Sequence, residues 1–112
     1  MADGPRYLVL FVADPADDGH ADALRAAARK VPGAGFFDDP VRGQARTVGT
    51  YLRLEGDDLA PARELVGRVA VVSGALAARV EVQLDERILG HLVAGEADPA
   101  LAGELEAAFG AP

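Results

Sequence analysis

The stretch from Arg6 to Ala13, RYLVLFVA, is the feature that most limits how this chain can fold. Successive side chains of a strand point to opposite faces of its sheet. Both faces of this segment are apolar, with Leu8, Leu10 and Val12 on one face and Tyr7, Val9 and Phe11 on the other. A strand that is apolar on both faces belongs inside a sheet that is covered on both sides.

The rest of the chain alternates between strand and helix patterns. Period-2 alternation predicts further strands over residues 34–37, 45–55 and 79–85. Helical spacing predicts one helix over 20–30, with Asp17 or Asp18 as its N-cap, and a second helix that Gly56-Asp57-Asp58 caps. A strand over 68–73 competes with this second helix, but the continuous apolar stripe favours the helix. Residues 88–93 fit a strand or an amphipathic turn, and Asp98-Pro99 predicts the start of a last helix.

This order predicts an α+β fold, a ferredoxin-like βαββαβ sandwich in one domain. Its core spans residues 6–85, and residues 86–112 form a C-terminal helical extension. Two helices cover only one face of a four-stranded sheet, yet the first and third strands carry apolar residues on both faces, Tyr51 among them. The C-terminal extension or a second copy must cover the other face. A twofold face-to-face homodimer, which would form a dimeric α/β barrel, is the first expectation.

Composition excludes several classes of function. The 11 basic and 18 acidic residues give a formal net charge of -7, so nucleic-acid binding is not expected. No apolar run is long enough for a membrane span, and no basic segment precedes an apolar one at the start. The chain has no Cys, which excludes disulfides and thiolate sites. We therefore expect a cytoplasmic protein without a cofactor or a structural metal.

Residues 38–62, DDPVRGQARTVGTYLRLEGDDLAPA, resemble the YCII-related family of small ferredoxin-like proteins, in the branch with an Asp-Gly-Pro-Phe signature. The residues in register with that branch are Asp38, Pro40, Gly49, Tyr51, Glu55, Asp57, Asp58, Leu59 and Ala62. Asp39 stands where the signature has Gly, and Val41 stands where it has Phe. The resemblance implies a dimer of ferredoxin-like subunits, some of which carry a His/Asp pair in a cleft.

His20 and Asp38 are the candidate catalytic pair. In the functional interpretation His20 is a general base that a carboxylate orients. In the structural interpretation His20 is an exposed residue at a helix start, and Asp38 belongs to a turn. The nearby cluster of Asp14, Asp17, Asp18 and Asp22 is explained by caps and turns without a metal ion.

Three further residues are candidates for ligand binding. Arg42 and Arg46 could hold an anion, or they could balance the neighbouring aspartates in a solvated loop. Tyr51 could donate a hydrogen bond into a cleft between subunits, or pack across the sheet. His91 is expected at an edge or an interface, and Ser73, the only Ser, lacks the setting of a nucleophile.

Two classes of function remain, with a third beside them. The first is a non-catalytic dimeric module that binds a small molecule or a protein partner. The second is a small acid/base enzyme, isomerase- or dehydrochlorinase-like, that uses His20 and Asp38. The third is a subunit that docks into a larger assembly through its C-terminal extension.

Overall fold

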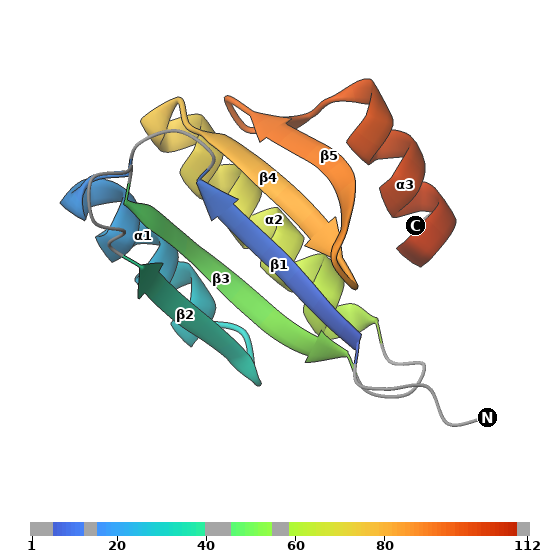
Figure 1. Cartoon of the computed structure of the whole chain (residues 1–112), viewed down its shortest axis with the longest axis horizontal. Helices are drawn as coiled ribbons and strands as arrows, with labels where there is room; N and C mark the ends of the chain where they lie inside the picture. The colour runs from blue at the N-terminus through green and yellow to red at the C-terminus, as the bar shows by residue number, and fades with distance from the viewer. Residues whose placement is uncertain (1–5, 13–15, 40–45, 55–58, 110–112) are drawn as a thin grey trace.

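Six antiparallel strands form one open sheet in the order β2-β3-β1-β4-β5-β6, with three helices packed against it (Figure 1). The computed structural model describes residues 6–12, 16–39, 46–54 and 59–109. The elements are β1 Arg6–Val12, α1 Asp18–Arg29, β2 Ala34–Asp39, β3 Thr47–Leu54, α2 Ala60–Leu76, β4 Arg79–Leu84, β5 Arg87–Val93, β6 Glu96–Ala97 and α3 Pro99–Phe109. The architecture is therefore α+β, as the sequence predicts.

Strand β1 lies inside the sheet, as its two apolar faces require. It pairs with β3 through Leu8↔Leu52 and with β4 through Leu10↔Val82. These side chains point to the face that the helices cover, and each is at most 3% exposed. The core of the protein therefore lies between β1, its two neighbours and the helices.

The helix starts differ in how they are capped. Asp17 caps α1, because its side chain accepts the His20 amide at 2.9 Å. Helix α2 has Leu59 as its N-cap and no side-chain cap, so the expectation that Gly56-Asp57-Asp58 caps it is wrong. Residues 55–58 themselves lie outside the described part of the chain. Over 68–73 the chain is helical, which decides against the competing strand.

Residues 86–112 are not a purely helical extension. Strands β5 and β6 continue the sheet beyond β4, and only then does α3 begin. Gly90 lies on β5 with φ +151°, and a Cβ there would come within 2.6 Å of the Leu101 amide nitrogen. Glycine at this position therefore lets the first turn of α3 pack closely on β5, with Leu101 fully buried.

Strand β2 extends further than expected. Asp38 and Asp39 pair with Val48 and Thr47 of β3, so they continue the strand, and the predicted turn at this point is wrong. The ladder hydrogen bonds to β3 outweigh the local turn preference of aspartate.

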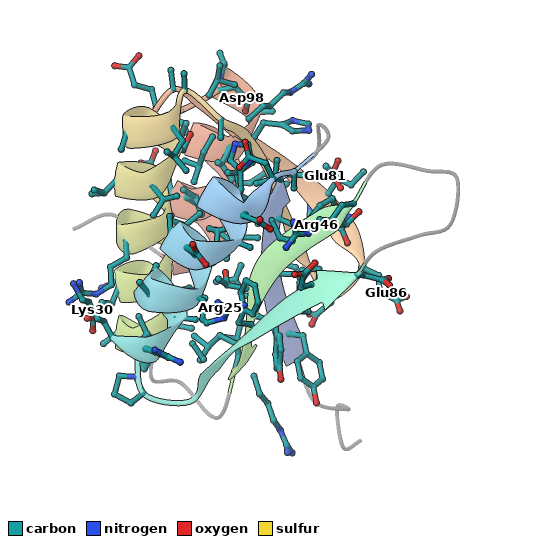
Figure 2. All side chains as sticks on the ribbon, turned by 90° about the vertical axis from the view of Figure 1, so that its left-hand side faces the viewer. Arg25, Lys30, Arg46, Glu81, Glu86 and Asp98 are labelled. Carbon is teal, nitrogen blue, oxygen red and sulfur yellow. The ribbon has the colours of Figure 1, made fainter. Side chains whose placement is uncertain are left out.

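All three helices lie on one face of the sheet (Figure 2). Leu101 of α3 joins the same core cluster as Leu92 of β5 and Leu65 of α2. The described part of the C-terminal extension therefore does not cover the other face, which we call the open face. Figure 1 looks onto this face, with α1 and α2 behind the sheet and α3 beside β5. None of the helices in the described ranges has the length and hydropathy that a membrane crossing needs.

Ser73 connects the last turns of α2 by hydrogen bonds to two segments that adjoin strands of the sheet. It is fully buried, its hydroxyl donates to the Ala78 carbonyl oxygen at 2.6 Å, and it accepts the Gly95 amide at 3.0 Å. One side chain thus joins α2 to the residue before β4 and to the turn between β5 and β6.

Replacement of Ser73 by Ala should lower the free energy of unfolding by about 1–3 kcal/mol, because the Gly95 amide loses its acceptor. Urea denaturation measures this change. Val71→Ala, on the exposed side of the same helix, should change it by no more than about 0.5 kcal/mol. Equal stabilities of the two variants would contradict the role given to Ser73.

Candidate functional site

The open face carries a cluster of aromatic side chains across its central strands. Val9 of β1 pairs with Tyr51 of β3, and Phe11 pairs with Gly49. Phe37 of β2 also lies opposite Gly49. Tyr7 and Tyr51 are each 41% exposed. These residues form the aromatic cluster of the open face: Tyr7, Val9, Phe11, Phe37 and Tyr51.

Two glycines give these rings their places. A Cβ on Gly35 would overlap the ring of Tyr51, which therefore lies across β2. A Cβ on Gly49 would come within 2.6 Å of both the Phe11 Cβ and the Phe37 Cζ. Glycine within a strand weakens it, but here it lets aromatic rings lie flat on the sheet. The two glycines therefore position the rings of the aromatic cluster, and Tyr51 packs across the sheet.

A polar strip borders the aromatic cluster on β4 and β5. Glu81 pairs with His91 across the two strands. The side-chain amide of Gln83 donates from Nε2 to Glu81 Oε2 at 2.5 Å. His91 Nε2 lies 3.4 Å from Glu81 Oε1. The side chains of Glu81 and His91 are 17% and 19% exposed, so this contact between an imidazole and a carboxylate is largely shielded from solvent.

Asp98 completes the strip from the other side of His91. One of its carboxylate oxygens, Oδ1, accepts the Leu101 amide at 2.8 Å and so caps α3, as predicted. The other, Oδ2, accepts the His91 amide at 3.1 Å and lies 3.6 Å from His91 Nδ1. These hydrogen bonds from Leu101 and His91 hold the pKa of Asp98 below its usual range.

The His91 cluster, Glu81, His91 and Asp98, was missed from the sequence. The alternation of residues 79–85 places Glu81 on the wet face, and the last helix start identifies Asp98 as a cap. Only the β4–β5 register brings His91 between them, and that register contains a bulge between Val82 and Gln83. A bulge of this kind cannot be read from periodicity alone.

Arg46 organises a second polar cluster at the start of α1. Its guanidinium donates two hydrogen bonds to Asp38, from Nε to Oδ1 at 2.9 Å and from Nη2 to Oδ2 at 2.7 Å. Nη1 donates to Asp18 Oδ1 at 2.7 Å. The Arg46 guanidinium lowers the pKa of Asp38, and the two carboxylates raise the pKa of Arg46. Figure 2 shows Arg46 between α1 and the sheet.

His20 serves the helix start and is not bonded to Asp38. Its Nδ1 accepts the Asp17 amide at 3.1 Å, in a capping box in which His takes the place of Glu. A ring nitrogen that accepts an N–H carries no proton to donate to the Asp17 carboxylate. The two groups therefore cap the helix and do not form an ion pair. Among the described residues, Asp38 takes its hydrogen bonds from Arg46.

Two of the predicted site residues cannot be placed. Arg42 and Asp14 lie outside the described residues. Within the ranges that the structure describes, no three His, Asp or Glu side chains are arranged to hold a metal ion.

A shallow groove runs between α1 and α2 on the side away from the sheet. It has a volume of about 240 Å³ and is lined mainly by alanine and valine, with Lys30 and Arg68 at its rim. Nothing in the sequence predicts it, because it arises where small Ala side chains of α1 face α2.

Comparison with protein-family models, curated proteins and solved structures finds no match to this chain. The resemblance to the YCII-related family therefore stays a prediction.

Replacement of Asp38 by Asn should destabilise the fold at pH 7 and have no such effect in acid. A carboxylate whose pKa is lower in the folded state stabilises it above the unfolded value, near 3.9, and loses this effect as the pH falls through the folded value. Urea midpoints of wild type and variant should therefore converge as the pH falls through the folded-state pKa of Asp38.

Asp39→Asn is the matched control, since Asp39 follows Asp38 on the opposite face of β2. It should leave the midpoint nearly unchanged at both pH values. An equal loss at pH 7 in both variants would contradict the part assigned to the Asp38–Arg46 pair.

Proposed function

We propose that this protein is a dimeric, ferredoxin-like binding module in which two copies associate through their open faces. The observation that carries the proposal is the aromatic cluster, seated on Gly35 and Gly49 and left uncovered by the described helices. Large exposed apolar patches are rare on monomers and mark surfaces of interaction. A second copy presents the same surface, and a twofold axis makes that surface complementary to itself.

The order of the elements supports the ferredoxin-like assignment. Strands β1 to β4 take the order β2-β3-β1-β4, with α1 after β1 and α2 after β3. This is the interleaved arrangement of two β-α-β units, and β5, β6 and α3 add to it at the β4 edge. Membership of the YCII-related family is part of the same proposal and rests on residues 38–62.

The polar part of the open face fits an interface as well. Glu81, Gln83 and His91 satisfy one another, and no buried side-chain nitrogen or oxygen of the described residues lacks a partner. A satisfied polar strip can be buried at a lower cost than isolated charges. Each copy carries a net charge of -7, so added salt should strengthen the association by screening the repulsion.

The non-catalytic class is favoured by how the predicted pair is engaged. Asp38 is held by Arg46 and His20 by the α1 cap, so each side chain has a structural task. Tyr51 borders the space between two facing sheets, where an apolar small molecule would be enclosed. The acid/base enzyme and the docking of the C-terminal extension stay predictions, and no contact in the described residues favours either.

Tyr51→Glu should weaken self-association by about 100-fold, because a carboxylate would be buried without a partner at a cost of about 3 kcal/mol. Sedimentation velocity over a range of concentrations measures the dissociation constant.

Val71→Glu is the matched control. Val71 is a 72% exposed apolar residue on α2, on the side of the molecule away from the open face. It should leave the dissociation constant unchanged. A wild-type protein that stays monomeric at all concentrations, or a dimer that Val71→Glu disrupts and Tyr51→Glu does not, would refute the proposal.

A further inference from the structure

We infer that His91 links self-association to protonation, so that two copies associate more tightly when its imidazole carries a charge. This inference rests on the proposed function, because it requires the open faces to meet. It assigns a task to the His91 cluster that neither the aromatic cluster nor the Arg46 cluster performs.

The geometry places one imidazole between two carboxylates. Nε2 of His91 faces Glu81 at 3.4 Å and Nδ1 faces Asp98 at 3.6 Å. A neutral imidazole carries one N–H and can satisfy one of these carboxylates, whereas the protonated ring can donate to both. The side chains come from β4, β5 and the start of α3, and Glu81 and Asp98 lie at the same end of the molecule in Figure 2.

Both carboxylates accept hydrogen bonds from further donors. Asp98 accepts the backbone amides of Leu101 and His91, and Glu81 accepts the side-chain amide of Gln83. With a neutral imidazole the His91 cluster therefore carries a charge of about -2, and protonation reduces it to about -1.

Burial of the His91 cluster increases the energetic effect of this difference in charge. The side chains of Glu81, His91 and Asp98 are already 17%, 19% and 29% exposed. A facing copy would remove much of the remaining water and bring a second cluster of the same sign nearby. The desolvation and repulsion of charge both grow with the net charge of the cluster. The associated state should therefore take up a proton that the free chain binds more weakly.

Exposed apolar side chains adjoin the His91 cluster, so the proposed interface reaches it. Ile88 and Val93, on the same strand as His91, are 56% and 48% exposed. Across the next strand pair, Phe11 of the aromatic cluster lies opposite Glu81. The His91 cluster therefore lies next to the aromatic cluster, with an exposed apolar residue before and after it on β5.

Several elements bring charged groups near His91. On β4 these are Arg79 and Glu81, on β6 Glu96, before α3 Asp98 and on α3 Glu104, which pairs with Arg87 of β5 at 3.1 Å. Strand β1 faces Glu81 with Phe11, which is uncharged. The chain has only two histidines, and His20 lies in the α1 cap on the helix side. A pH dependence between 5.5 and 8 that depends on His91 is therefore separable from all others.

The test compares dissociation constants at pH 5.5 and 8.0 in about 0.15 M salt, measured by sedimentation velocity on the full chain. Wild type should associate about tenfold more tightly at pH 5.5. His91→Gln, which cannot take up a proton, should reduce this ratio to about twofold. His20→Gln is the matched control: it removes the other imidazole of the chain, on the helix side, and should keep the wild-type ratio, including any general effect of approaching the isoelectric point.

A second measurement uses only the wild-type protein, so it does not depend on whether a variant folds. In NMR spectra of the wild type at pH 7, the protonated fraction of the His91 ring should rise with protein concentration, while that of His20 stays constant. Equal pH ratios in both variants, or a protonated fraction of His91 that is independent of concentration, would overturn the inference while the dimer stands. A chain that is monomeric at every pH would overturn the proposed function first, and this inference with it.

Discussion

The two-sided apolar character of β1 is the constraint on which the rest of this structure depends. One side of β1, with Leu8 and Leu10, builds the core under the helices, and this fixes β3 and β4 as its neighbours. The other side, with Tyr7, Val9 and Phe11, is apolar as well, although an antiparallel sheet can leave one face to water. The helices use only one face, so the second face is where an interaction with another molecule can be built.

Local pattern was sufficient to predict most of the fold. The apolar run of β1, the alternation of β3 and β4 and the helical spacing of the three helices identified these elements. Where the prediction failed, a tertiary contact had overridden a local preference. Asp38 and Asp39 look like a turn but pair with β3. For residues 88–93, where the sequence left a strand and an amphipathic turn open, pairing with β4 decides for the strand. The cap of α2 falls on Leu59, a residue with no capping side chain.

The site was less accessible from sequence than the fold. In the structure Asp38 accepts hydrogen bonds from Arg46, and the side chain of His20 belongs to the α1 capping box. The contacts of Arg46 join β2 to the start of α1, which no periodicity encodes, whereas the contact of His20 is local to the helix start. The partners of His91 were hidden for a similar reason, since a bulge sets the β4–β5 register. Tyr51 could be assigned to the open face from alternation alone, and its seat on Gly35 follows once β2 and β3 are paired.

The measurement that tests this account most directly is an isotope-filtered nuclear Overhauser experiment on a mixture of labelled and unlabelled chains. It detects contacts between copies and ignores those within one copy. The account predicts intermolecular signals from the rings of Phe11, Phe37 and Tyr51. Intermolecular signals confined to the outer surfaces of α1 and α2, or none from these rings at concentrations where the chains associate, would contradict it.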